Sequence, residues 1–251
     1  MSSAMKIVPG DALDIQQMKT TIGPGVYKNP KTQNIIPAAA GYLNVKINKK
    51  NTNQLAYIES KSKRYIPKAN DFVVGIVTGT IGESYKVSLQ DFSANVLLSM
   101  MAFPNATKKN RPNLKVGQVV YARVSQDIPE IDIEIECIDP ATGKEGGFGM
   151  LDESGYIFEV GLNYANELLF NPSSVYLEKL ASKCKFEVAI GLNGKIWIKC
   201  GDGLVYEEDQ LTEAGANDFR YTLAAATYLK KCQKVPKSQV DAVLKESFKN
   251  L

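Results

Sequence analysis

Histidine is absent from all 251 residues of this chain, and cysteine occurs only four times, with no Cys-x-x-Cys pair. The missing histidine removes the commonest general acid or base and the commonest activator of a serine or cysteine nucleophile. Zinc sites of the usual kind need closely spaced Cys and His ligands, which this sequence lacks. We therefore expect reduced, structural cysteines, no metal, no cofactor and no enzymatic activity.

Long apolar runs and a strong net charge are missing too. No stretch reaches the roughly 20 apolar residues that span a bilayer, and the first residues, MSSAMKIVPGD, lack the apolar core of a secretory signal. We expect no membrane contact and a location in the nucleus or cytosol. The 30 basic and 27 acidic residues give a net charge of only +3. A surface for an anionic partner must therefore come from local clustering.

Hydrophobic patterning predicts a multidomain chain. Residues 1–68 carry short apolar runs between Gly, Pro and Asn turn signals, which indicates a small β domain. Residues 69–141 contain five β-rich runs, which predict a five-stranded barrel of the OB type; these runs are 72–79, 84–89, 94–100, 117–124 and 131–137. In the last run, alternation predicts that Ile131, Ile133 and Ile135 face the core, while Asp132, Glu134 and Glu136 face water.

Residues 142–251 predict a mixed α/β domain. The expected order is a strand at 156–160, helices at 163–170 and 174–184, a hairpin at 186–199 and a helix at 218–233. Ser238 and Asp241 resemble a capping box that opens a final helix. Strand, two helices, two strands and helix is a KH-like arrangement.

The connection between the third and fourth predicted barrel strands is strongly basic. Residues 105–115 include Lys108, Lys109, Arg111 and Lys115 and no acid. OB-type barrels bind oligonucleotides on one sheet face and its bordering loops, where cations neutralise phosphates. This segment is therefore the best candidate for RNA contact, and an ordinary solvated basic loop is the alternative.

Lys86 and Arg123 fall inside predicted barrel strands, where alternation could place them on an outer face beside that segment. We include both as candidate RNA-binding residues. Tyr85 and Tyr121 are aromatics that could stack on a base. Tyr85 has the parity of Val87 and Leu89, however, so packing in or at the edge of the barrel core is favoured.

Two further patterns admit a chemical interpretation. The acidic residues between 127 and 139 could hold magnesium for a nuclease built on Asp132, Glu134 and Glu136, but they follow one exposed strand and are better interpreted as a solvated face. Gly191, Leu192, Asn193 and Gly194 match the GxxG letters of a KH phosphate clamp. The alternating residues 195–199 follow, so a structural hairpin with a type I′ turn at Asn193 and Gly194 is favoured.

Four segments together resemble a known family. They are residues 64–67 (RYIP), 71–77 (DFVVGIV), 85–87 (YKV) and 191–197 (GLNGKIW), in this order. Their order and spacing, together with SYKVSLQDF and AFPNATKKNRP, resemble the cap proteins of the RNA exosome over nearly the whole chain.

The resemblance implies a non-catalytic subunit that sits with two other S1-type cap proteins on a ring of RNase-PH-like subunits. Single-stranded RNA would be guided, largely independently of its sequence, into a channel for 3′-to-5′ processing and degradation, in the nucleus and nucleolus and also in the cytoplasm. Lys108, Lys109 and Arg111 would face RNA at the channel mouth, and the Gly191, Asn193 and Gly194 motif would be structural. The alternative is a free-standing S1/KH RNA chaperone or translation factor.

Overall fold

The computed structural model describes residues 5–13, 15, 19–47, 53–128, 130–207 and 210–249. It divides into two units, residues 1–62 and residues 63–251. The predicted domain limits, 1–68, 69–141 and 142–251, stay predictions.

The N-terminal unit is built from short strands. Its four-stranded sheet has the order β1-β5-β6-β2, and a separate hairpin pairs β3 with β4. The bounds are β1 (Met5–Ile7), β2 (Lys19–Ile22), β3 (Val26–Lys28), β4 (Ile35–Pro37), β5 (Gly41–Ile47) and β6 (Asn53–Glu59). Ile7, Val26 and Ile58 form its small buried core. The predicted small β domain is confirmed.

The second unit begins with a closed barrel. Its strands are β7 (Phe72–Ile81), β8 (Ser84–Ser88), β9 (Val96–Ser99), β10 (Val119–Gln126) and β11 (Glu134–Glu136). The order is β11-β9-β8-β7-β10, pairing of β10 with β11 closes the ring, and β12 (Gly149–Met150) adds to the edge of β10. Alternate residues such as Val120, Ala122 and Val124 fill the interior. The predicted five-stranded OB-type barrel is confirmed.

The last barrel strand is shorter than its sequence pattern suggests. Ile135 is buried and Ile133 is partly buried, but Ile131 is exposed. Pairing with β9 and β10 starts only at Glu134, and the Ile131 N–H donates to the Ile128 carbonyl in a turn (3.2 Å). The prediction that Ile131 faces the core was therefore wrong, because the turn, not the ladder, orients it.

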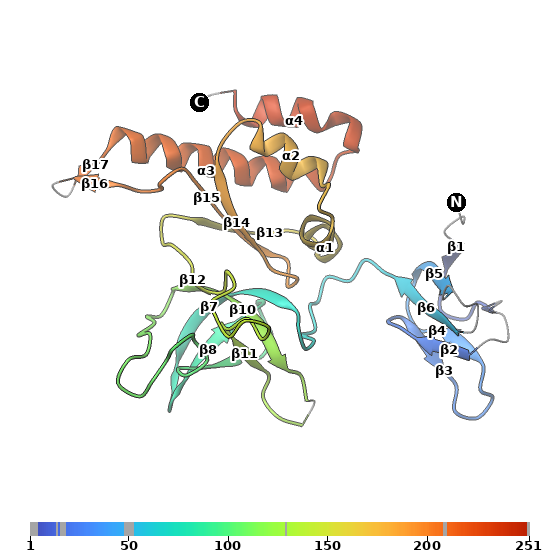
Figure 1. Cartoon of the computed structure of the whole chain (residues 1–251). Helices are drawn as coiled ribbons and strands as arrows, with labels where there is room; N and C mark the ends of the chain where they lie inside the picture. The colour runs from blue at the N-terminus through green and yellow to red at the C-terminus, as the bar shows by residue number, and fades with distance from the viewer. Residues whose placement is uncertain are drawn as a thin grey trace. The chain divides into compact units, whose positions relative to one another are not determined.

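A KH-type domain completes the unit. Its three-stranded sheet, β13-β15-β14, carries helices on one face, while the other face turns toward the barrel (Figure 1). The elements are β13 (Tyr156–Glu159), α1 (Leu162–Phe170), α2 (Val175–Ala181), β14 (Phe186–Ile190), β15 (Lys195–Cys200), β16 (Tyr206–Glu207), β17 (Gln210–Leu211), α3 (Glu213–Cys232), η1 (Lys237–Gln239) and α4 (Val240–Ser247). The predicted KH-like order is confirmed.

Two helix starts differ from the predictions. Helix α3 begins at Glu213, earlier than residue 218, because the Thr212 hydroxyl accepts a hydrogen bond from the Gly215 N–H (3.1 Å) and caps it. The proposed capping box was wrong: Ser238 lies within η1, and α4 follows Gln239, which makes no side-chain cap bond.

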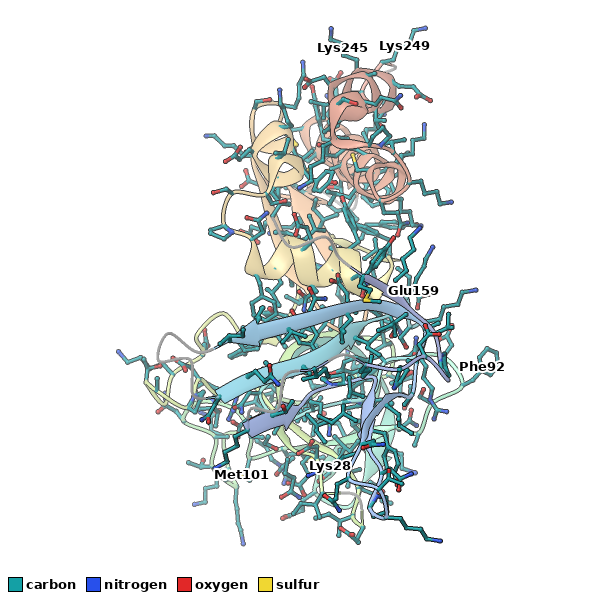
Figure 2. All side chains as sticks on the ribbon, turned by 90° about the vertical axis from the view of Figure 1, so that its right-hand side faces the viewer. Lys28, Phe92, Met101, Glu159, Lys245 and Lys249 are labelled. Atoms are coloured by element: carbon teal, nitrogen blue, oxygen red, sulfur yellow. The ribbon has the colours of Figure 1, made fainter. Side chains whose placement is uncertain are left out.

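The strand order assigns each barrel loop to one of two ends. The β7–β8 turn and the β9–β10 connection share one end, where the Met100 N–H donates to the Glu83 carbonyl (2.9 Å). Strands β9 and β11 are parallel neighbours, so the loops that precede them, 89–95 and 127–133, share the opposite end. Phe92 extends into solvent from the first of these loops (Figure 2).

Candidate nucleic-acid interface

The basic loop, residues 105–115, has a defined local structure. Thr107 and Asn110 exchange two backbone hydrogen bonds (2.8 and 3.1 Å), and the Thr107 hydroxyl also accepts from the Asn110 N–H (3.0 Å). A tight turn therefore carries Lys108 and Lys109 at its tip, where both are exposed. The fold presents these two ammonium groups to solvent.

Tyr85 fixes the other side of the basic loop to the barrel. Its ring is buried in the barrel core, and its hydroxyl donates to the Pro112 carbonyl (2.6 Å) and accepts from the Leu114 N–H (3.1 Å). Tyr85 therefore lies in the core, as its parity with Val87 predicts, and it is not available to stack on a base. The alternation of apolar residues in the sequence gave no sign that the Tyr85 hydroxyl anchors the basic loop.

Arg111 has a weak protein partner. Its guanidinium lies 3.7 Å from a Glu83 carboxylate oxygen, and both side chains are exposed. Exposed ion pairs contribute about 0–1 kcal/mol, so the guanidinium can exchange Glu83 for a phosphate at small cost. The structure brings Lys108, Lys109 and Arg111 together on one loop.

Lys86 and Arg123 are placed differently. Lys86 is half-buried on β8, opposite Gly79 and Leu97. Arg123 pairs with Glu136 and with the Asn70 side chain, and it is only 12% exposed. Because Arg123 lies four residues along β10 from its start at Val119, about 13 Å of strand separates it from the basic loop's end of the barrel. RNA contact by Lys86 and Arg123 stays a prediction, and Glu136 offsets the Arg123 charge.

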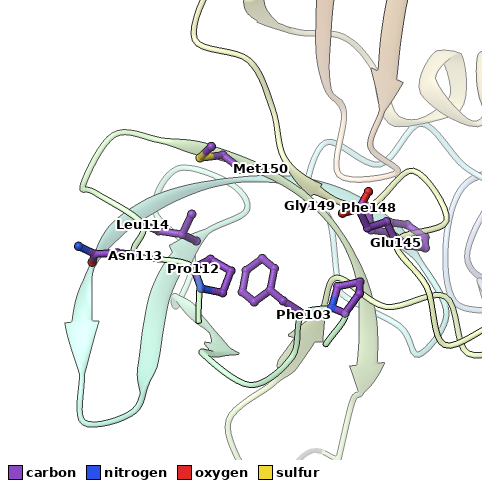
Figure 3. A pocket seen from close by; sticks show the side chains of 9 residues that line it. Phe103, Pro112, Asn113, Leu114, Glu145, Phe148, Gly149 and Met150 are labelled. Atoms are coloured by element: carbon purple, nitrogen blue, oxygen red, sulfur yellow. The ribbon is translucent and has the colours of Figure 1, made fainter. Parts of the chain in front are cut away.

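A pocket of about 420 Å³ opens at the root of the basic loop (Figure 3). Most of its lining residues have apolar side chains, and Asn113 and Glu145 are the polar ones; the other residues are Phe103, Pro104, Pro112, Leu114, Phe148, Gly149 and Met150. Sequence patterning missed it because the lining comes from two segments, 103–114 and 145–150, which only the barrel brings together.

Tyr121 is partly buried where the barrel meets the KH domain. Its ring packs on Phe72 and Phe148, and its hydroxyl donates to the Ile190 carbonyl of the KH domain (3.3 Å). Burial raises its pKa to about 12. Tyr121 therefore connects barrel and KH domain and is not a free stacking platform.

The Gly191 to Gly194 tetrad joins the KH domain to the barrel. The buried Asn193 amide donates to the Val74 and Leu89 carbonyls (2.8 and 2.6 Å), and its oxygen accepts from the Val74 N–H (3.2 Å). The Leu192 N–H donates to the Phe72 carbonyl (2.7 Å). These groups are used by the barrel backbone, so the tetrad has the geometry of a structural clasp and not of a phosphate clamp.

The turn type at this tetrad was predicted incorrectly. The Gly194 N–H donates to the Gly191 carbonyl (3.0 Å), and Gly194 has a φ of +82°, but Asn193 is not among the described residues with positive φ. A type I′ turn needs positive φ at both central positions. The tetrad instead resembles a type I turn followed by a left-handed glycine, which leaves the Asn193 side chain directed at β7.

The acidic residues between 127 and 139 do not gather into one site. Glu136 pairs with Arg123, whereas Asp132 and Glu134 are exposed. Over the part of the chain that the structure describes, no group of three or more His, Cys, Asp or Glu side chains could hold a metal ion. In the same described ranges, no helix is long and apolar enough to cross a membrane.

A five-stranded barrel clasped to a KH sheet, with a basic loop at one barrel end, defines a nucleic-acid-binding protein of the S1/KH class. Family models agree over three stretches: the "Exosome complex exonuclease Rrp40 N-terminal domain" matches residues 20–64, the "Exosome complex component RRP40, S1 domain" residues 65–149, and the "KH domain" residues 155–204. The chain belongs to the Rrp40 family of exosome complex components.

Individual relatives support this assignment. The chain is 47% identical to the exosome complex component RRP40 of Saccharomyces cerevisiae, over 98% of this chain and 96% of that protein. It is 36% identical to the Schizosaccharomyces pombe exosome complex component rrp40, over 75% of this chain and 76% of the relative. A crystal structure described as a putative exosome complex RNA-binding protein matches the fold, with a TM-score of 0.50 and 18% identity over 74% of this chain and 96% of that one.

Proposed function

We propose that this chain is a non-catalytic, RNA-binding cap subunit of the RNA exosome, which guides RNA into the channel for 3′-to-5′ processing and degradation. Its partners would be single-stranded RNA, the RNase-PH-like ring subunits and the other cap subunits. The observation that carries the proposal is the exposed, acid-free basic loop on an S1 barrel in a chain of the Rrp40 family. We propose a location in the nucleus and nucleolus, and also in the cytoplasm.

The geometry favours phosphate contacts over base recognition. Lys108 and Lys109 lie at the tip of an exposed turn, where flexible ammonium groups can follow a strand of phosphates. Such contacts position a strand without specifying its sequence. The absence of histidine and the failure of the acidic residues between 127 and 139 to gather into one site support a role without catalysis.

The test is a Lys108→Ala, Lys109→Ala, Arg111→Ala triple variant in the reconstituted complex. Each cation that displaces counterions from single-stranded RNA contributes roughly 0.7 to the salt slope, so the slope should fall by up to about 2. RNA affinity should fall, sequence preference should hardly change, and stability should move by less than about 0.5 kcal/mol. Fluorescence titrations with RNAs of different sequence, at several salt concentrations, measure RNA affinity, salt slope and sequence preference. A thermal melt measures stability.

A matched control removes three cations from the KH domain, with the changes Lys183→Ala, Lys185→Ala and Lys234→Ala. All three lysines are exposed, and the variant has the same net charge as the loop variant. An equal loss of affinity in both variants would show that only total charge matters. An unchanged affinity and salt slope in the loop variant would leave the loop as an ordinary solvated surface.

The free-standing chaperone or translation factor remains the second candidate, and purification separates the two. A tagged chain recovered from cells with ring subunits at equal stoichiometry supports the cap subunit. A chain recovered alone, with strong RNA affinity of its own, supports the free-standing protein.

A further inference from the structure

The barrel end opposite the basic loop carries acids. Its two loops, 89–95 and 127–133, lie side by side because the Leu97 N–H donates to the Ile133 carbonyl (2.9 Å) and the strands that follow them are parallel. They contain Asp91, Asp127, Glu130 and Asp132 and no Lys or Arg. We call these two loops the acidic end. By contrast, the β9–β10 connection contains four cations and no acid.

The flanking segment 63–71 neutralises part of this negative charge. It carries Lys63, Arg64 and Lys68, and the Lys68 ammonium lies 3.4 Å from an Asp127 carboxylate oxygen. Asp91, Glu130 and Asp132 are exposed. The Gln90 side chain bonds the backbone of Lys63 and Tyr65, so the cations of this segment lie beside the loop that contains Asp91. The excess of negative charge therefore lies on the 127–133 loop, at Glu130 and Asp132.

Phe92 is the most unusual residue of the acidic end. Its side chain is fully exposed, and its φ of +60° lies in the left-handed region that bulky residues rarely adopt. The loop is held in place because the Gln90 side chain accepts from the Tyr65 N–H (3.0 Å) and donates to the Lys63 carbonyl (2.9 Å). Strained residues of this kind persist where the surroundings determine them, and they cluster at binding sites.

Two more large apolar side chains are exposed on the neighbouring loop. Ile128 and Ile131 are 47% and 51% exposed, and the hydrogen bond between their backbones places them on one turn. The acidic end thus combines three exposed apolar side chains with exposed carboxylates. Aromatic anchors that fill a partner's pocket contribute much of the binding energy of protein interfaces.

We infer that the acidic end is a docking surface for a protein subunit that presents an apolar recess for Phe92, bordered by Lys or Arg side chains. Charge decides between partner classes: carboxylates repel RNA phosphates and attract a basic protein surface. The barrel would then use its basic end for RNA and its acidic end for protein. The identification of the partner as a subunit of the same assembly rests on the proposed function.

The test compares full-length Phe92→Asn with wild type for binding to a reconstituted ring-and-cap assembly that lacks this subunit. Asn tolerates left-handed φ, so the loop conformation is kept while the ring is lost. Binding should weaken at least tenfold, and the melting temperature should not fall. The control, Val116→Asn, changes an apolar residue that is 71% exposed at the opposite end of the barrel, and it should bind as wild type does.

A second pair of variants tests the charge. Asp132→Lys should weaken binding several-fold, whereas Glu159→Lys, at an exposed acid of the KH domain, should not. Equal binding of wild type, Phe92→Asn and Asp132→Lys would overturn the docking surface and leave the proposed function standing. Wild type that fails to bind the assembly would overturn both. Unchanged assembly with weaker RNA binding by Phe92→Asn would assign this end to RNA and also overturn the inference.

Discussion

Asn193 is the residue on which the joint between barrel and KH domain depends most directly. Its side chain satisfies three backbone groups of the barrel, at Val74 and Leu89, from which it is 119 and 104 residues distant in sequence. Asn193→Ala would leave these buried groups without partners, and we expect it to lower the free energy of unfolding by about 2–4 kcal/mol. Chemical denaturation measures this, with the exposed Asn113→Ala as control. A stable variant that lost RNA binding would restore the phosphate-clamp interpretation.

A substitution at Gly194 tests the same joint between barrel and KH domain through the backbone conformation. Its φ is +82°, and a Cβ placed there would lie 2.7 Å from the Val160 carbonyl oxygen. Gly194→Val should therefore cost on the order of 1–3 kcal/mol of stability. The expected result is a lower melting temperature with an unchanged salt slope of RNA binding. An unchanged melting temperature would contradict the assigned turn geometry.

The basic loop and strand β8 form a functional element together, because Tyr85 supplies two hydrogen bonds to the loop. Tyr85→Phe keeps the buried ring but leaves the Leu114 N–H and the Pro112 carbonyl without this partner. We expect a stability loss of about 1–2 kcal/mol. RNA affinity should fall a few-fold because the loop is less well positioned, while the salt slope stays unchanged because every cation remains. Tyr221→Phe, at an exposed phenol, is the control, and equal behaviour of the two variants would exclude an anchoring role.

The barrel elements show which local signals are reliable. Alternation in β8 correctly predicted that Tyr85 shares the core face with Val87, because this strand is paired with both β7 and β9. The same alternation failed at Ile131, where the ladder has not yet begun. Periodicity predicts which residues share a face, but only pairing decides where a strand starts.

At the scale of the whole molecule, each apolar core formed by the described residues lies within one unit. The buried cluster of the N-terminal unit contains residues of that unit alone, and the barrel and KH clusters contain residues of the second unit alone. We therefore expect residues 63–251 to unfold cooperatively without the N-terminal unit.

The N-terminal unit has many turns and few basic clusters, so we predict that it contacts protein. Deletion of residues 1–62 should weaken assembly onto the ring in size-exclusion reconstitution, and unchanged assembly would contradict this role.

Local patterns determined much of this protein. The order of a β domain, an OB-type barrel and a KH-like domain follows from the sequence, because hydrophobic alternation and turn residues act over a few neighbours. The charge of the basic loop could also be read directly, and the hairpin at Asn193 and Gly194 was identified, although its turn type was not.

Tertiary structure alone decided what the individual side chains do. Tyr85 reaches the basic loop 27 and 29 residues away, Asn193 clasps a strand more than a hundred residues away, and Glu136 offsets the charge of Arg123. Tertiary structure also decided that the two ends of the barrel differ in charge and that the ring of Phe92 is exposed. Each depends on strand register and closure of the barrel, which bring distant segments together, and a pattern of neighbouring residues contains no measure of those distances.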